Sequence, residues 1–179
     1  YGAYADWVKG KPATSDFDRQ FRVAKETRVA RWRAALDKVG MQDTPVPTHF
    51  ELFRGLGGED FVRDVARAWA DDKATHVNVR SFEAASWSMR EKTGHNFAKK
   101  TGVVVKWNCP LENTLYDQVV DDSSFIMAHH DEHEVIAGTG SKAGVTLPKE
   151  EQLVRYKDQV YTYAERATLL AKLKKDGVL

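Results

Sequence analysis

The sequence has few of the features that define several common classes of protein. Its single cysteine, Cys109, excludes an intrachain disulfide and any metal site built from paired cysteines. No stretch approaches the roughly 20 consecutive apolar residues that a membrane-spanning helix needs. An excess of one charge is also missing, because 27 Lys and Arg residues face 26 Asp and Glu residues, a formal net charge of +1. The chain therefore has no overall field that would attract nucleic acid or an anionic membrane, although a local basic patch is compatible with these counts.

The composition is otherwise that of an ordinary globular protein. The 179 residues are 42% hydrophobic and 30% charged, which excludes a wholly disordered chain. The length is typical of one compact domain with a substantial core. The chain begins at Tyr1 and shows no secretory signal peptide. We therefore expect a segment of a longer protein.

The spacing of apolar residues predicts one long amphipathic helix over residues 16–39, with Ser15 as its N-cap and Gly40 as its end. Seven basic residues are spread along it: Arg19, Arg22, Lys25, Arg28, Arg31, Arg33 and Lys38. They form either a solvated helix face or a contact surface for an anionic partner. We expect residues 1–47 to be an N-terminal helical segment that packs on a core formed by residues 48–179.

Short apolar runs bounded by turn residues predict strands and shorter helices in that core. The expected strands are 50–54, 76–79, 103–107, 125–128, 134–137 and 160–163, and the expected helices are 61–69, 89–100 and 166–175. Gly55, Gly57 and Gly58 are expected to end the first strand. The strands are grouped and do not alternate regularly with helices, which predicts an α+β fold with largely antiparallel sheets.

Arg54 is the first candidate functional residue, because it lies on an expected strand directly before Gly55. An arginine in this position can present its planar fork to a phosphate or a carboxylate, and glycine permits close approach of the backbone. The alternative is an ordinary exposed arginine at the end of a strand.

The second candidate is the run Ser86-Trp87-Ser88, which follows a strand-like segment and precedes a helix-like one. In an extended chain the two serine side chains lie on the same face. Alternatively, Ser88 caps the following helix, which alone would explain its presence.

The third candidate is Glu132-His133-Glu134, at the start of an expected strand. Carboxylates two residues apart on a strand point to the same face, where their mutual repulsion raises the pKa of one of them. Paired carboxylates suit a reaction that passes through an oxocarbenium ion, because one stabilises the positive charge and the other handles a proton or a nucleophile. The alternative is a solvated acidic turn.

A metal site and a dinucleotide-binding loop are less well supported by the sequence. His129, His130 and His133 lie among acidic residues, which suits a metal site, but the HExxH spacing is missing and adjacent strand residues point to opposite faces. The glycines of residues 55–58 suggest a dinucleotide-binding loop, but the GxGxxG pattern and its strand–helix–strand context are missing. Cys109 has no persuasive catalytic partner and is interpreted as a buried thiol.

The order of the three candidates resembles the Arg-Ser-Glu class of mono-ADP-ribosyltransferases, which includes cholera-type and clostridial binary toxins. An arginine on an early strand, a Ser-x-Ser about thirty residues later and a Glu-x-Glu at a late strand correspond to residues 50–55, 81–98 and 125–137. Trp87 stands where the family usually has threonine. The resemblance covers roughly residues 48–140. It implies two small antiparallel sheets that form an NAD-binding cleft, flanked by helices.

The resemblance also implies how NAD is bound and cleaved. Arg54 would bind the NAD pyrophosphate, and the backbone of Gly55 would bind the nicotinamide carboxamide. Ser86 would orient Glu134, which would stabilise the oxocarbenium ion as nicotinamide leaves. Phe97, eleven residues after Ser86, would stack on nicotinamide, the alternative being ordinary helix packing. NAD is then a consumed substrate, and no metal is expected.

On the acceptor side, the resemblance implies that Glu132 positions and helps to deprotonate the incoming nucleophile. A Glu in this position goes with transfer to protein arginine. His129 and His130, in the turn before Glu132, become candidates for target recognition, and the helix over residues 16–39 is expected beside the cleft.

These implications suggest a toxin or effector domain, delivered by secretion as part of a longer protein into the cytoplasm of a target cell, with a protein acceptor, a cognate immunity protein and no membrane partner. A phage-encoded enzyme fits nearly as well. RNA as acceptor and simple NAD hydrolysis are alternatives within the same chemistry. Alternatives of other classes are a non-catalytic interaction domain with the same fold and a metallohydrolase centred on the histidines.

Overall fold

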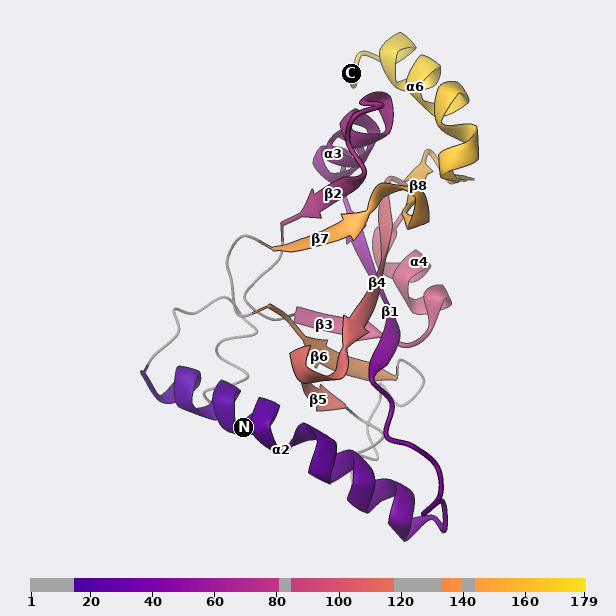
Figure 1. The fold of residues 1–179 in the computed structure, drawn as a ribbon. Helices are drawn as coiled ribbons and strands as arrows, with labels where there is room; N and C mark the ends of the chain where they lie inside the picture. The colour runs from indigo at the N-terminus through magenta and orange to yellow at the C-terminus, as the bar shows by residue number, and fades with distance from the viewer. Residues whose placement is uncertain (1–14, 81–84, 118–132, 140–143) are drawn as a thin grey trace.

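The computed structural model describes residues 15–80, 85–117, 133–139 and 144–179 as a mixed α+β fold (Figure 1). The strands of the larger sheet are β1 (His49–Gly57), β3 (Ala85–Ser88), β4 (Gly102–Pro110), β5 (Thr114–Asp117), β6 (Glu134–Ala137), β8 (Leu153–Tyr156) and β9 (Gln159–Tyr161). The smaller sheet pairs β2 (His76–Val79) with β7 (Val145–Pro148). The helices are α2 (Ser15–Lys38), α3 (Glu59–Ala70), α4 (Glu91–Ala98) and α6 (Arg166–Lys175).

The α+β class and the antiparallel pairing are confirmed, but one of the two sheets is large. Its seven strands have the order β5-β6-β3-β1-β4-β8-β9. The cause is the length of β1 and β4, which pair without a break from His49 opposite Pro110 to Gly57 opposite Gly102. This long pair carries β3 on one edge and β8 on the other, and so joins what would otherwise be two short sheets.

The sequence predicted that Gly55, Gly57 and Gly58 end the first strand, but the strand continues past Gly55. Gly55 and Gly57 both lie inside β1, opposite Val104 and Gly102 of β4. The last residue of β1 is Gly57, and the next residue, Gly58, has a φ of 132°, which residues other than glycine rarely adopt.

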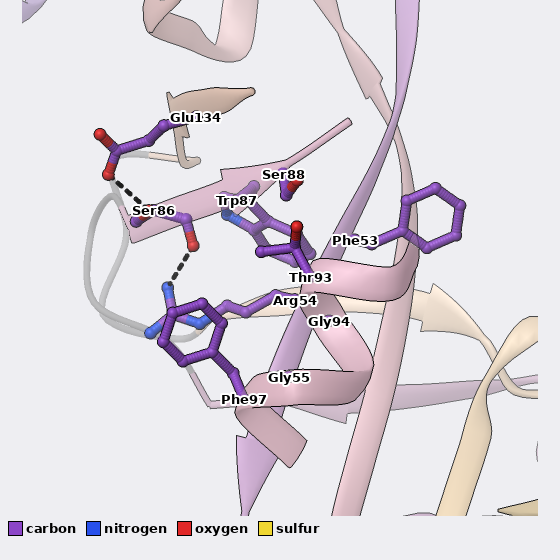
Figure 2. Close-up of a pocket in the computed structure, with 10 residues that line it drawn as sticks. All are labelled: Phe53, Arg54, Gly55, Ser86, Trp87, Ser88, Thr93, Gly94, Phe97 and Glu134. Carbon is purple, nitrogen blue, oxygen red and sulfur yellow. Dashed lines mark hydrogen bonds between the residues drawn. The ribbon is translucent and has the colours of Figure 1, made fainter. Parts of the chain in front are cut away.

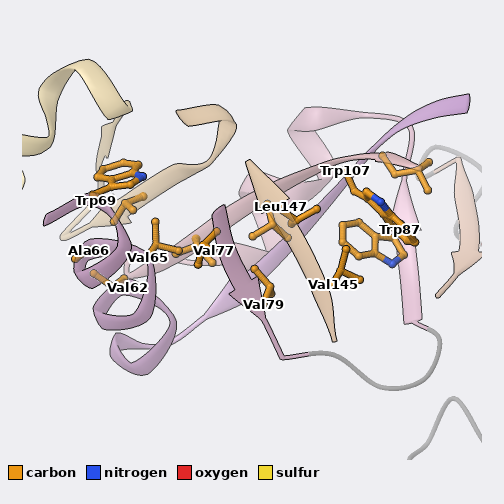
Figure 3. Close-up of a cluster of buried hydrophobic side chains, with 14 of the residues drawn as sticks. Val62, Val65, Ala66, Trp69, Val77, Val79, Trp87, Trp107, Val145 and Leu147 are labelled. Atoms are coloured by element: carbon orange, nitrogen blue, oxygen red, sulfur yellow. The ribbon is translucent and has the colours of Figure 1, made fainter. Parts of the chain in front are cut away.

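The main core lies between the large sheet on one side and α3, α6 and the small sheet on the other (Figure 3). The buried residues of α3 follow the helical period: Val62, Val65, Ala66 and Trp69. The strands β2 and β7 each bury alternate residues, as strands with one covered face do. Trp87 and Trp107 pack with their ring centroids 5.2 Å apart and join β3 to β4 within this core. Helix α4 covers the opposite face of the sheet, over Phe53 and Val104.

Several elements match the sequence-based expectations closely. The strands at 76–79 and 134–137 and the helix at 166–175 are confirmed. The helix expected over 89–100 is shorter, because Lys99 has a φ of 57°. The expected last strand is confirmed as β9, whereas β3, β5, β7 and β8 were not among the expected strands. The strand expected at 125–128 lies outside the described residues.

Helix α2 packs against β5 and the short 3₁₀ helix η1 (Leu111–Asn113) at one end of the molecule. Two of its cations make contacts within the fold, a role that neither the solvated face nor the partner surface expected from the sequence included. Arg28 is fully buried and donates a hydrogen bond to the carbonyl oxygen of Leu115. Arg33 ties the helix end to the following turn through Asp37 and the carbonyls of Met41 and Thr44.

None of the helices that the structure describes is long and apolar enough to cross a membrane.

Cys109 is fully buried in β4, where its Sγ donates to the carbonyl oxygen of Pro110 at 3.4 Å. Burial raises the pKa of its thiol, so the reactive thiolate is scarce at neutral pH. We expect Ellman's reagent to label no cysteine in the native protein and one cysteine per chain after unfolding in guanidinium. Rapid labelling of native protein would contradict this placement of β4.

Candidate functional site

Three adjacent strands bring Arg54, Ser86 and Glu134 together (Figure 2). The Ser86 hydroxyl donates a hydrogen bond of 2.6 Å to Oε1 of Glu134, across 48 residues of sequence. The Arg54 guanidinium donates through Nη1 to the carbonyl oxygen of Ser86 at 3.3 Å, across 32 residues. Ser86 on the middle strand, β3, therefore contacts Glu134 on β6 with its side chain and Arg54 on β1 with its main chain.

The register of β3 and β6 explains the first of these contacts. Ser88 lies opposite Glu134, and Ser86 lies opposite Ile136. Residues two apart on a strand share a face, so the Ser86 and Glu134 side chains are diagonal neighbours on one face of the sheet. The extended arrangement of the two serines is thus the one that the structure adopts.

The second contact depends on a gap between β1 and β3. These strands pair at a single position, Phe53 opposite Ser88, and separate beyond it. Further pairing would have set Gly55 opposite Ser86 and engaged the backbone of both. Instead, the carbonyl of Ser86 accepts from the Arg54 side chain, and a pocket forms where the two strands diverge.

Arg54 carries a partly desolvated positive charge at this pocket. Its side chain is half-buried, and burial lowers the pKa of the guanidinium, although arginine remains protonated at neutral pH. Among the residues that the structure describes, the hydrogen-bond partner of Arg54 is the Ser86 carbonyl, and no carboxylate pairs with the guanidinium. A cation in this state gains more than a solvated one from an incoming anion, through charge-assisted hydrogen bonds.

A glycine contact sets how closely α4 lies on β1. A Cβ atom added at Gly55 would lie 2.0 Å from the carbonyl oxygen of Gly94 and 2.4 Å from the backbone nitrogen of Ala98. Only glycine fits at position 55 without moving the helix. Gly94, which also lines the pocket, was not singled out from the sequence, although a lone glycine in a helical pattern often marks such a close approach.

The pocket has a volume of about 190 Å³. Its lining combines the three polar residues with apolar and small ones from β1, β3 and α4: Phe53, Arg54, Gly55, Ser86, Trp87, Ser88, Thr93, Gly94, Phe97 and Glu134. Phe97 is 54% exposed, so it does not serve ordinary helix packing. Its ring lies at the pocket beside Arg54 in Figure 2.

Ser88 supports the site indirectly. It is almost fully buried, and its Oγ accepts the backbone N–H of Arg90 at 2.9 Å, in the turn that leads into α4. It does not cap the helix itself, since the residue before Glu91 is Arg90. Ser88 thus fixes the connection between the strand that carries Ser86 and the helix that carries Phe97.

The acceptor side of the predicted site is only partly described. Glu132, His129 and His130 lie outside the described residues. His133 is described, and its φ of 46° is left-handed, so β6 begins only at Glu134. The strand alternation used to place both carboxylates on one face therefore does not extend back to His133.

The other candidate sites gain no geometric support. Within the described part of the chain, no group of three His, Cys, Asp or Glu side chains is arranged to hold a metal ion. Gly55 and Gly57 belong to an antiparallel strand, which is not the setting of a dinucleotide-binding loop. The described residues of α2 do not line the pocket, contrary to the expected place of that helix beside the cleft.

Comparison with models of protein families, with curated proteins and with solved structures finds no match for this chain. A functional assignment therefore depends on the geometry of the pocket and on the residue pattern that predicted it. Both identify the same three polar residues, Arg54, Ser86 and Glu134.

Proposed function

We propose that the protein is a mono-ADP-ribosyltransferase of the Arg-Ser-Glu class, which transfers ADP-ribose from NAD to a macromolecular acceptor. The observation that carries the proposal is the double contact of Ser86, whose hydroxyl binds Glu134 while its carbonyl accepts from Arg54. Residues far apart in the sequence and expected to act together thus meet in one pocket. The divergence of β1 and β3 is then the NAD cleft, in a variant of the ADP-ribosyltransferase fold with one enlarged sheet.

Arg54 is suited to bind the pyrophosphate of NAD. Its guanidinium is half-buried and has no carboxylate partner among the described residues. A phosphate oxygen would complete its hydrogen bonding and neutralise its charge, and the planar fork favours two parallel hydrogen bonds. The contact with the Ser86 carbonyl holds the side chain at the pocket before NAD arrives.

Glu134 is suited to stabilise the positive charge that develops on the nicotinamide ribose. When the bond between C1′ and the nicotinamide nitrogen breaks, its electron pair goes to nicotinamide, and C1′ with the ring oxygen becomes an oxocarbenium ion. A carboxylate held in place by Ser86 needs little reorganisation as that charge forms. The acceptor then forms a bond to C1′ and loses a proton.

The size and lining of the pocket suit the nicotinamide end of NAD. Its volume of about 190 Å³ is below the roughly 300–1,000 Å³ usual for sites that enclose a whole drug-sized ligand. One aromatic ring and part of a ribose fit this scale. Phe97 offers an exposed ring at the pocket, where stacking on the flat nicotinamide would remove apolar surface from water.

We propose protein arginine as the acceptor, because Glu132 completes a Glu-x-Glu sequence with Glu134. A guanidinium is protonated at neutral pH and needs a base before it can attack. Glu132 would supply that base, with His129 and His130 in contact with the target. In this proposal the domain acts in the cytoplasm of a target cell, as part of a secreted toxin or effector that an immunity protein restrains.

The proposal is tested by nicotinamide release from NAD, measured with the purified protein alone and with a bacterial lysate as a source of acceptors. We expect release in both conditions and faster release with lysate. Label from the adenine portion of NAD should then appear on protein; label on RNA would change the acceptor class, and release without labelling would indicate an NAD glycohydrolase.

Two further outcomes would contradict the proposed transferase. Absence of release in every condition would favour a non-catalytic interaction domain with the same fold. Release that is lost after chelator treatment and restored by a divalent metal would favour a metallohydrolase that uses His129, His130 and His133.

A further inference from the structure

The turn before α4 is joined to the residue before β6 by a side-chain contact that the catalytic residues do not explain. Nη2 of Arg90 lies 2.9 Å from Nε2 of His133. The backbone N–H of Met89 also donates to the carbonyl oxygen of His133, at 3.3 Å. His133 directly precedes Glu134, so both contacts act on the residue next to the proposed catalytic carboxylate.

The chemistry of the two side chains fixes the direction of the hydrogen bond. A guanidinium has only donors, so Nε2 of His133 must be the acceptor. The imidazole is then neutral, with its proton on Nδ1. A hydrogen bond from a charged donor is among the stronger ones, and a lysine in place of Arg90 would reach less far.

His133 needs such support because of its backbone conformation. Its φ of 46° lies in the left-handed region, which costs a non-glycine residue free energy and persists only where the surroundings impose it. The left-handed residue turns the chain immediately before β6 begins at Glu134. The direction in which the Glu134 carboxylate leaves the sheet therefore depends on how firmly His133 is held.

Arg90 is itself anchored to the same site. Its backbone N–H donates to Oγ of Ser88, the residue that pairs with Glu134 across β3 and β6. A closed ring of contacts thus runs from Ser88 through Arg90 and His133 to Glu134 and back across the strand pair. This ring lies beside the hydrogen bond between Ser86 and Glu134 and is distinct from it.

We propose that Arg90 is a positioning residue for Glu134, acting through His133. This inference rests on the proposed function, since it concerns the rate of NAD cleavage. Arg90 is exposed and His133 only half-buried, so their contact contributes little to global stability. A small displacement of Glu134 would still slow the reaction strongly, because the carboxylate must lie close to the developing cation.

The test compares Arg90→Met with Lys92→Met, which removes the same charge from the exposed first turn of α4 without touching His133. We expect Arg90→Met to lower kcat for NAD hydrolysis about 10- to 100-fold, with KM for NAD nearly unchanged. Lys92→Met should keep the wild-type kcat. Both variants should melt within about 3 °C of the wild type.

Substitutions at His133 test the other half of the contact. His133→Leu removes the acceptor and should lower kcat as much as Arg90→Met does, whereas His133→Gln places an amide near Nε2 and should retain most of the activity. Combining Arg90→Met with His133→Leu should lower kcat no more than either substitution alone, because each removes the same hydrogen bond between the two side chains. Additive losses, or full activity of Arg90→Met, would overturn the inference.

A spectroscopic measurement separates this inference from the proposed function. The ¹⁵N signals of His133 should show a proton on Nδ1 in the wild type and lose that signature in Arg90→Met. An inactive wild type with the Nδ1 signature would refute the transferase and leave the contact standing. An active wild type without that signature would refute the positioning role alone.

Discussion

Replacement of Glu134 by glutamine is expected to slow nicotinamide release about 10³-fold. Glutamine has nearly the same shape and keeps an oxygen that can accept from Ser86, so what is lost is the negative charge beside the oxocarbenium ion. Two unit charges about 4 Å apart near a protein surface attract with about 4 kcal/mol, and about 1.4 kcal/mol corresponds to tenfold in rate. The measurement is kcat for nicotinamide release, with melting temperature as the check on folding.

A matched variant separates the charge of Glu134 from its orientation. Ser86→Ala keeps the carboxylate and removes the hydroxyl that holds it at 2.6 Å. We expect a smaller loss, about 10- to 100-fold, because the charge remains and only its placement is relaxed. Full activity of Glu134→Gln would mean that the pocket between β1 and β3 is not where NAD is cleaved.

Replacement of Gly55 by alanine is expected to destabilise the protein by about 3 kcal/mol, at the upper end of the usual cost of overpacking, and to lower its melting temperature by roughly 6–12 °C. The added Cβ would lie within 3 Å of three backbone atoms of α4, in Gly94, Phe97 and Ala98. Backbone of a helix cannot rotate aside as a side chain can, so the whole helix must shift. Thermal unfolding followed by circular dichroism measures the effect.

Gly57→Ala is the matched control, since both glycines lie in β1. A Cβ at Gly57 would meet Cδ of the flexible Lys99 side chain at 3.2 Å and the Phe97 carbonyl at 3.4 Å. We expect this variant to melt within about 3 °C of the wild type, because the lysine side chain can move aside. Alanine also lowers the conformational entropy of the unfolded chain, which offsets part of any cost in the folded state. Equal melting of both alanine variants would contradict the close packing of α4 on β1.

The candidate site was more predictable from the sequence than the sheet that holds it. Ser86 and Glu134 were recognised from the Ser-x-Ser and Glu-x-Glu patterns and from their order after Arg54, and the apolar run after Glu134 predicted the limits of β6. Their mutual distance could not be predicted, since it depends on the register of two strands far apart in the chain. The link that Arg54 makes to the main chain of Ser86 has no sequence signal.

The errors in the fold have specific causes. Gly55 and Gly57 were interpreted as strand breakers because glycine is unfavourable in strands, but β1 continues through both, and at Gly55 the close approach of α4 requires glycine. β8 was missed because Arg155 interrupts its apolar pattern, although the guanidinium is tied to the carbonyl of His95. The left-handed His133 was missed because its pattern looked like a continuous strand.

The double contact of Ser86 has a consequence for any survey of this protein by substitution. Of its two contributions, only the hydroxyl is encoded by the identity of the residue, because every amino acid supplies the carbonyl that accepts from Arg54. Saturation mutagenesis at position 86 would therefore detect the loss of the hydrogen bond to Glu134 but would not test the hydrogen bond from Arg54. An amide-to-ester replacement after position 86, which weakens that carbonyl as an acceptor, would measure the missing half.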